Sequence, residues 1–262
     1  MELRVNDGRL ALRAALPADL DSIQSLLEKV GLPVCELDKH LDSFLMAHQH
    51  GRLLACAGME FYETTALLRS LAVEPEYQGL GLGRKMTRAL LAAASRGGAV
   101  EAVVLTSSAV GLARSLGFRE TPREVLPQAI RNSWEFTSAC CSGARCMRLS
   151  LQPRHFRPLD LPLSETVPGA RMWAIGLVDT MLTFFEVEPG SRFEAHTHPS
   201  EQITLVLEGE LFFEFGGKVV RLTSGEAIAV PANAPHAVFT GTIPARAVDA
   251  WSPPPSEYEQ RQ

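Results

Sequence analysis

The second half of the chain contains only short apolar runs, each followed by turn residues. From residue 165 onwards the sequence includes MLTFFEVEPG, ITLVLEG, LFFEFGG, KVVRLTSG and EAIAVPAN. Every run has the length of a strand rather than that of a helix, and glycine, proline or asparagine follows it. A series of short strands with this spacing predicts an all-β sandwich or barrel for residues 165–262.

The first half has a different pattern, in which helix-like segments alternate with strand-like ones. The segment PADLDSIQSLLEKVGL places Ile23, Leu26 and Leu27 on one helical face, whereas LLACAGMEFY, ALLRSLAV and EAVVLTSS are strand-like. This alternation is typical of α/β or α+β packing and predicts a first domain over residues 1–150. The proline-rich residues 151–164 show little periodicity and are predicted to form a linker.

Composition and charge narrow the classes of function. The 262 residues include 46% hydrophobic and 21% charged side chains, the balance of a soluble globular protein. A net charge of −5 does not favour a nucleic-acid partner. The N-terminus lacks the apolar stretch of a signal peptide, and no apolar run is long enough to cross a membrane. With five cysteines and no disulfide framework, we expect a cytoplasmic protein with reduced thiols and no membrane partner.

A glycine-rich turn is the most informative feature of the first half. In LAVEPEYQGLGLGRKM (71–86), a strand-like run ends at Val73, and Gly79, Gly81 and Gly83 lead into a helix. Glycines let backbone N–H groups converge, and a helix N-terminus adds partial positive charge, so the segment suits a pyrophosphate. The spacing is neither that of a P-loop nor the dinucleotide G-x-G-x-x-G. A tight strand-to-helix turn without a ligand is the alternative.

The same segment resembles the acetyl-CoA motif of the GNAT N-acetyltransferases. That motif is V-x-P followed by Q-x-x-G-x-G, here Val73, Pro75, Gln78, Gly81 and Gly83. The downstream strand EAVVLTSS and the helix that ends in LGF fall where the GNAT fold places its next strand and helix. The resemblance implies that acetyl-CoA is contacted by Leu71, Val73, Gln78, Gly79, Gly81, Gly83 and Arg84.

The resemblance also implies a fold and a chemistry for residues 1–150. We expect a GNAT fold with a mixed, mostly antiparallel sheet, in which the amine of a small molecule attacks the acetyl thioester directly. Scattered blocks such as GLPVCELDKHLDSFLMA and EFTSACCSGARCM are similar to the GNAT subfamily associated with arsenic resistance. Cys140, Cys141 and Cys146 then suggest a site for a soft ion, although ordinary thiols are the alternative.

Three residues of the first half are candidates for the chemistry itself. The resemblance places Glu60 beside the thioester as the base, and a solvated carboxylate at a strand end is the alternative. Arg69 interrupts the apolar run ALLRSLAV, so it either pairs within the protein or binds an anionic acceptor. Ser107-Ser108 replace the asparagine seen in many members, and Ser108 is kept as a candidate. Ala113 stands where many members carry the tyrosine that protonates the leaving thiolate, so the acid is unassigned.

The stretch HTHPSEQ (196–202) suggests a metal site in the second half. Side chains alternate along a strand, so His196 and His198 share a face. Continuing the alternation, Gln202 lies on that face, whereas Glu201 points away unless a bulge intervenes. His236 follows a later turn and is available as a further ligand.

These spacings resemble the two motifs of the cupins. The matching positions are Gly190, His196, His198 and Gly209 in the first motif, and Gly225, Pro231 and His236 in the second. The resemblance implies an all-β cupin barrel that holds a divalent metal through His196, His198, Gln202 and His236. Histidine suits Zn, Ni, Fe and Mn alike, so the metal is not identified. The ending D-A-W-S-P-P is similar to small cupins of the pectin-degradation type, which act on unsaturated uronates.

Three functional hypotheses follow. In the first, an acetyl-CoA-dependent N-acetyltransferase acting on a small, anionic, amino-acid-like amine is fused to a metal-binding cupin. In the second, the cupin is a metalloenzyme for a sugar-acid-like molecule and the first domain is a degenerate CoA-binding module. In the third, the cupin is a non-catalytic sensor or a homodimerisation module. The intact glycine segment favours the first hypothesis, and Ala113 keeps the second open.

Overall fold

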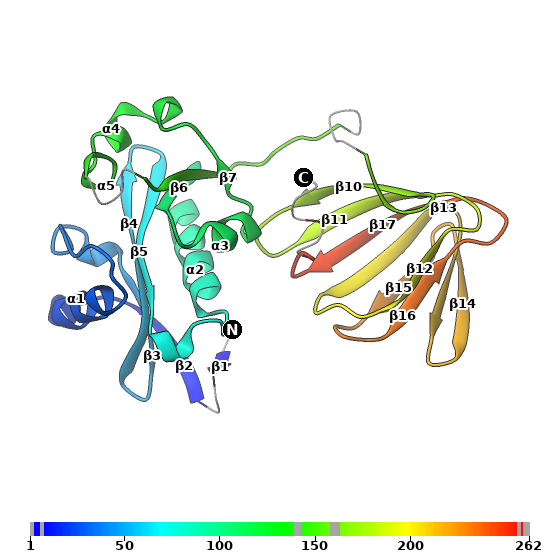
Figure 1. Ribbon diagram of the computed structural model, residues 1–262, viewed down its shortest axis with the longest axis horizontal. Coiled ribbons are helices and arrows are strands. Elements are labelled where there is room, and N and C mark those ends of the chain that lie inside the picture. The colour runs from blue at the N-terminus through cyan, green and yellow to red at the C-terminus, as the bar shows by residue number, and fades with distance from the viewer. Residues whose placement is uncertain (1–2, 6–7, 139–142, 158–162, 256–257, 259–262) are drawn as a thin grey trace. The chain divides into compact units, whose positions relative to one another are not determined.

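Two separate sheets form the two halves of the chain in the computed structural model (Figure 1). The structure describes residues 3–5, 8–138, 143–157, 163–255 and 258. The first compact unit contains residues 1–114 and 118–153, and the second contains residues 115–117 and 154–262. The prediction of an α/β domain with a mixed sheet, followed by an all-β barrel, is confirmed. Among the described residues, no helix is long and apolar enough to cross a membrane.

The first unit contains an eight-stranded sheet in the order β1-β2-β3-β4-β5-β6-β8-β7. Its strands are β1 (Leu3–Val5), β2 (Gly8–Ala14), β3 (Leu45–Gln49), β4 (Arg52–Tyr62), β5 (Thr65–Val73), β6 (Glu101–Thr106), β7 (Arg119–Glu120) and β8 (Arg145–Ser150). Its α-helices are α1 (Leu20–Lys29), α2 (Leu82–Arg96), α3 (Val110–Ser115), α4 (Gln128–Arg131) and α5 (Trp134–Thr137). The short strand β1 was not expected from the sequence pattern.

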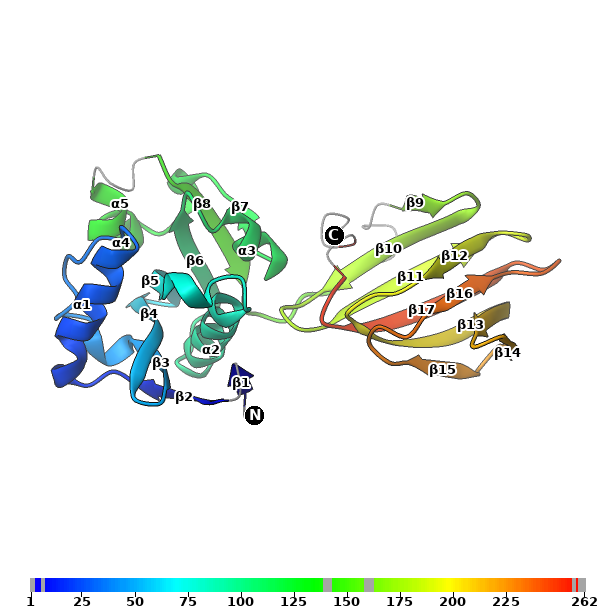
Figure 2. The same ribbon diagram turned by 60° about the horizontal axis from the view of Figure 1, so that its bottom comes forward.

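Helices α1 and α2 cover opposite faces of this sheet, as Figures 1 and 2 show. Ile23 and Leu27 of α1 are fully buried against Phe44 and Cys56. Helix α2 packs against β4 and β5 and buries Met86 among other side chains. Both helices therefore bury one apolar stripe each, as their spacing requires.

The central strands separate at one end of the sheet. Strands β5 and β6 are parallel, and their register runs from Thr65 opposite Glu101 to Leu68 opposite Val104. Beyond that point β5 continues to Val73 without pairing to β6. Ser70 there has a φ of 56°, in the left-handed region that a non-glycine residue rarely adopts. The backbone of β5 next to the glycine segment thus has an edge that is not paired with β6.

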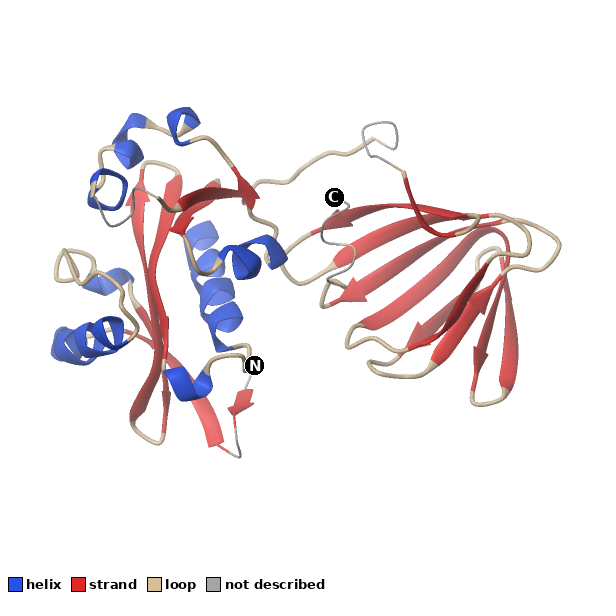
Figure 3. Cartoon of the chain, in the orientation of Figure 1, coloured by secondary structure: helices blue, strands red, loops and turns tan. Residues whose placement is uncertain are grey.

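Between residues 163 and 255 the second half of the chain contains strands and no α-helix (Figure 3). They are β9 (Ser164–Val167), β10 (Ala170–Gly176), β11 (Met181–Val187), β12 (Arg192–His196), β13 (Glu201–Phe215), β14 (Lys218–Thr223), β15 (Ala227–Val230), β16 (His236–Phe239) and β17 (Ala245–Ser252). Their order is β12-β16-β13-β17-β11-β10-β9, and β14 and β15 also pair with β13. Every recorded pair within this unit is antiparallel.

The long strand β13 belongs to both faces of the barrel. Its first half pairs with β15 and β17, and its second half pairs with β14 and β16. The change of partner occurs at Gly209, whose φ is 76°. A Cβ atom added at Gly209 would lie 1.9 Å from the carbonyl oxygen of Pro244, so only glycine fits where β13 bends. Phe213, Val206 and Met172 fill the core between the faces.

Candidate functional site

The glycine segment forms an open cradle at the N-terminus of α2. Gly81 is the residue before the helix and has a φ of 78°, and Gly79 has a φ of 77°. No side chain caps the helix, and its first turn contains no acidic residue. The amides of a helix's first turn have no acceptor within the helix, so they are available to an anion. Gln78 stabilises the turn, because its Nε2 donates to the carbonyl oxygen of Val73 over 3.1 Å.

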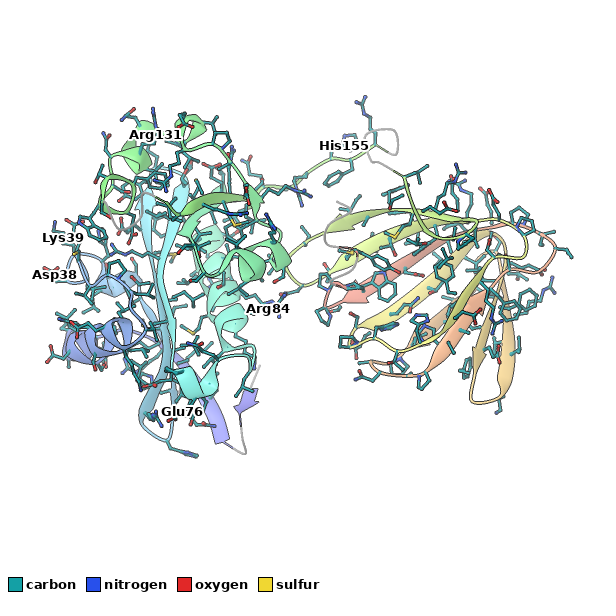
Figure 4. All side chains as sticks on the ribbon, viewed as in Figure 1. Asp38, Lys39, Glu76, Arg84, Arg131 and His155 are labelled. Atoms are coloured by element: carbon teal, nitrogen blue, oxygen red, sulfur yellow. The ribbon has the colours of Figure 1, made fainter. Side chains whose placement is uncertain are left out.

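An apolar wall lies beside this cradle. A Cβ atom at Gly83 would lie 3.5 Å from Leu112, 3.8 Å from Leu71 and 3.8 Å from Val73, which places the start of α2 against these side chains. Leu71 and Val73 are only half-buried, although both lie in a central strand. Arg84, labelled in Figure 4, lies in the first turn of the same helix and is half-buried. The residues that the resemblance assigned to acetyl-CoA are therefore next to one another.

Glu60 lies in a buried network of charged and polar groups. Its side chain is 2% exposed, so the alternative of a solvated carboxylate is wrong. One carboxylate oxygen accepts a hydrogen bond from Arg69, and the other accepts one from the hydroxyl of Tyr62. His40 is half-exposed, and its Nε2 lies 3.6 Å from Oε1 of Glu60. Burial and the bond to Glu60 both raise the pKa of Tyr62, so its hydroxyl stays protonated.

Arg69 is paired within the protein. Besides Glu60, its Nε lies 3.1 Å from Oε1 of Glu135, and one terminal nitrogen donates to the carbonyl oxygen of Cys35 over 2.8 Å. Arg69 is opposite Gly58, just after the last residue pair between β5 and β6. The network thus contains one guanidinium and two carboxylates at the point where the two strands separate.

Other residues singled out in the first half lie outside this network or cannot be placed. Ser108 is exposed in the turn between β6 and α3, and no side-chain hydrogen bond is recorded for it. Ala113 is buried in α3, so it provides no group that could protonate a thiolate. Cys140 and Cys141 lie outside the described residues. Burial raises the pKa of Cys146 to about 11, which keeps that thiol protonated.

Three histidines converge in the second unit. His196 ends β12, His198 follows it, and His236 begins β16, and their ligand atoms lie within 4.8 Å of one another. In each ring, Nδ1 lies next to a main-chain carbonyl oxygen, namely that of Glu194 at 2.7 Å, Ser200 at 2.7 Å and Ala234 at 2.9 Å. A carbonyl can only accept, so each Nδ1 carries the proton and each Nε2 keeps its lone pair.

Gln202 completes this arrangement. It is buried while Glu201 is exposed, in agreement with the alternation along β13. The Nε2 of Gln202 donates to Thr204 over 2.9 Å, and Thr204 donates to Asp249 over 2.6 Å. These two hydrogen bonds orient the amide of Gln202 so that its Oε1 faces Nε2 of His198, at 3.1 Å. Two acceptor atoms therefore face each other, as they do around a shared cation.

Burial affects the protonation of two side chains in the second site, His236 and Asp249. His236 Nε2 is buried and has no hydrogen-bond partner among the described residues, which is costly unless a ligand binds it. Burial lowers the pKa of His236 and so favours the neutral, ligating form. Burial raises the pKa of Asp249 to about 7.

A small cavity lies beside His196, His236 and Gln202. Its free space is about 40 Å³, enough for an ion and a few water molecules. The rest of the lining is largely aromatic and aliphatic, including Trp251, apart from the polar side chains of Thr204 and Asp249. Tyr258 also lines this cavity and packs against Trp251, with ring centroids 5.8 Å apart.

Several members of the two sites were not found from the sequence. No sequence motif identifies Glu135, Tyr62 or His40. Glu135 is distant from Arg69 in the sequence, and the fold brings the two side chains together. Thr204 could have been found, because it is two residues after Gln202 and so lies on the same face of β13.

Two protein families match separate parts of the chain. The acetyltransferase (GNAT) domain matches residues 40–120, and the cupin domain matches residues 183–251. An uncharacterised N-acetyltransferase of Chlorobaculum tepidum is 30% identical over 114 residues, which is 43% of this chain and 71% of that relative. The relative's similarity therefore concerns less than half of this chain.

Solved structures resemble the two units separately. N-acetylglutamate synthase of Neisseria gonorrhoeae, in complex with coenzyme A and N-acetyl-glutamate, is 20% identical, with a TM-score of 0.49 over 55% of this chain. This chain spans 35% of that enzyme's length. KdgF from Halomonas sp. is 21% identical, with a TM-score of 0.39 over 40% of this chain and 98% of its own.

Proposed function

Because the chain belongs to the GNAT family of acetyltransferases, we propose that it transfers the acetyl group of acetyl-CoA to a small amine. We also propose that the cupin domain that follows holds a divalent metal. One observation carries the first part. The open cradle at Gly81 lies next to the stretch of β5 that is unpaired with β6, and Arg69 of the Glu60 network lies in that stretch. The proposed binding positions lie in sequence along one surface of the domain, from the pyrophosphate through the thioester to the acceptor.

In this proposal, acetyl-CoA binds along the glycine segment. The amides of Leu82, Gly83 and Arg84 bind the pyrophosphate, because they lie at a helix N-terminus with partial positive charge. Leu71 and Val73 contact the pantetheine arm through their half-buried side chains, and Gln78 holds the turn in shape. The free backbone groups of β5 suit the amides of that arm, since an unpaired strand edge must bind some donor or acceptor.

The proposed reaction needs one proton acceptor near the thioester. The amine nitrogen attacks the carbonyl carbon, the carbon–sulfur bond breaks, and CoA leaves as the thiolate while the nitrogen loses a proton. Glu60 receives this proton. Its carboxylate has lone pairs that remain available after it accepts the hydrogen bonds from Arg69 and Tyr62. His40 is the half-exposed neighbour through which the acceptor's proton reaches this buried carboxylate.

Binding of acetyl-CoA is the direct test. We expect acetyl-CoA to raise the thermal midpoint of the first domain, since a ligand that binds only the folded state stabilises it by about 2.7 kcal/mol at 100 Kd. Gly81→Val should abolish most of the shift. The matched control is Gly98→Val, which introduces similar backbone strain, with a φ of 90°, at the opposite end of α2. No shift in the unmodified protein, or an equal loss in both variants, would contradict the proposed cradle.

We propose that the acceptor is amino-acid-like and that its anionic group binds Arg69 in exchange for Glu135. Arg69 has two carboxylate partners, one more than its charge requires. Glu135 is the more exposed of the two, at 12% compared with 2% for Glu60, and it lies on the four-residue helix α5. A carboxylate or another oxyanion of the substrate can therefore replace it more readily than Glu60.

Removing the charge of Glu135 reveals the sign of the acceptor's charge. We expect Glu135→Gln to lower the KM of amines that carry a carboxylate by about 5-fold, the effect of about 1 kcal/mol. Neutral amines should be unaffected, and the exposed Glu124→Gln should change neither class. A higher KM for carboxylate-bearing amines, or a lower KM for cationic ones, would show that Arg69 does not receive the substrate's anionic group.

The cupin domain is proposed to bind its metal through His196, His198, His236 and Gln202. The fit rests on the three Nε2 lone pairs, the buried Nε2 of His236 and the facing oxygen of Gln202. None of the four ligands is charged, so a bound divalent ion would keep its full charge and polarise an anionic or carbonyl oxygen. A second candidate function, a metalloenzyme for a sugar-acid-like molecule, is favoured by the carboxyl group of Asp249 in the same cavity.

A further inference from the structure

The outer face of the cupin sheet is apolar over several strands. Antiparallel pairs place outward side chains of β10, β11, β17, β13 and β15 in register. One row contains Trp173, Phe184, Val248, Leu205 and Ala227, and the next contains Ile175, Leu182, Ala250, Ile203 and Ala229. Ile203 is 54% exposed and Leu182 is 40% exposed. Soluble monomers rarely expose apolar side chains in such continuous rows, which indicates an interface.

A row of alternating charges borders the apolar rows. Its members in strand order are Arg171 on β10, Glu186 on β11, Arg246 on β17 and Glu208 on β13. Arg171 lies 3.1 Å from Glu186, and Arg246 lies 3.0 Å from Glu208. On the edge strand β9, the carboxylate of Glu165 instead accepts a hydrogen bond from the amide of Gly169.

When this row of charges faces a second copy of itself in the reverse order, each positive side chain lies opposite a negative one. A two-fold axis parallel to the strands, placed between β11 and β17, reverses the strand order in the second copy. It sets Arg171 opposite Glu208 of the second copy, and Glu186 opposite Arg246. It also sets the apolar side chains of β10 and β11 opposite those of β13 and β17. Shifting the axis by half a strand spacing, onto β17, would place Arg246 opposite itself, so the charges select one register.

We propose that this face binds the same face of a second copy of the chain, with the two-fold axis between β11 and β17. An isologous interface requires a self-complementary charge row, because a residue of one copy that contacts a second residue of the other copy is repeated in the opposite direction by the two-fold axis. Burying Ile203, Leu205 and Leu182 supplies the favourable free energy, since apolar area is removed from water. The bordering ion pairs are exposed and contribute register rather than affinity. The proposal is independent of acetyl transfer and of the metal.

The oligomeric state of the full chain tests the interface. We expect sedimentation equilibrium to give twice the chain mass of 28.5 kDa. Ile203→Glu combined with Leu205→Glu should give a monomer that remains folded, because both side chains point out of the barrel. The matched control is Val219→Glu, which adds a charge at an equally exposed position on β14 and should leave the dimer intact. A monomeric wild type, or a dimer that survives the double substitution, would overturn the proposal.

Reversing all four charges tests the register separately. The variant R171E/E186R/R246E/E208R keeps its internal ion pairs and its self-complementarity, so it should dimerise as the wild type does. A mixed dimer would place arginine opposite arginine and glutamate opposite glutamate, so subunits of the two proteins should not exchange. Free exchange, measured with differently labelled chains, would exclude this axis. Loss of the variant's own dimer would exclude it as well, provided that its circular dichroism is unchanged.

Discussion

Glu60→Gln is expected to lower kcat for acetyl transfer by about 10²–10⁴-fold, the usual contribution of a positioned general base. Glutamine keeps the size of the side chain and one acceptor oxygen, but it cannot take a proton from the amine. Arg69 keeps Glu135 as a charged partner at 3.1 Å, so the network is weakened without leaving an unpaired guanidinium. Steady-state release of CoA thiol at saturating acetyl-CoA measures the effect. The KM for acetyl-CoA should not change, because the cradle at Gly81 is untouched.

A second buried carboxylate in the same sheet provides the control for stability. Glu101 also accepts a hydrogen bond from a buried hydroxyl, that of Thr65 at 2.7 Å, and pairs with Arg148 at 2.5 Å. It begins β6, at the end opposite to where β5 and β6 separate. Glu101→Gln should therefore lower the free energy of unfolding and leave kcat within about 2-fold, below the effect of a lost general base. If the two variants lose kcat equally, or if Glu60→Gln keeps full kcat, Glu60 is not the base.

The first site shows which kinds of information a sequence contains. The glycine segment is local, because three glycines and a helix start define an anion cradle within a few residues. The network around Glu60 is not local. Glu135 reaches Arg69 from a short helix far along the chain, and His40 reaches Glu60 from a loop before β3. Neither has a spacing that could identify it, so the pairing of Arg69 required the fold.

The second site shows a case in which hydrophobicity and position disagree. Along the start of β13 the polar residues Gln202 and Thr204 point inward, and the apolar residues Ile203 and Leu205 point outward. Polarity alone assigns the opposite faces, because apolar residues usually face the core. The histidine spacing predicted the inward direction of Gln202 correctly, since all ligands must reach one point. The consequence, an apolar outer face, could be recognised only when the neighbouring strands were in register.

His236→Ala is expected to remove the metal from the cupin domain. His236 provides the buried Nε2 that has no hydrogen-bond partner among the described residues, so its lone pair contributes directly to binding. The loss of affinity should exceed the about 10–100-fold that loss of a ligand's outer hydrogen-bond partner costs. Elemental analysis of the protein purified with metal should change from about one ion per chain, as for a single site, to almost none. The thermal shift on adding the ion should disappear in parallel.

A graded series distinguishes loss of a ligand from loss of the fold. Gln202→Ala keeps the three histidines and should lower metal affinity less than His236→Ala does, since the amide is the weakest donor of the set. His155→Ala removes an exposed histidine between β8 and β9, labelled in Figure 4, and should have no effect. Each histidine ring is bonded to a main-chain carbonyl group and is not part of the backbone pairing of the strands. Each variant should therefore keep its sheet content in circular dichroism. Stoichiometric metal in folded His236→Ala would show that the ion binds elsewhere, and the convergence of the three rings would then need another explanation.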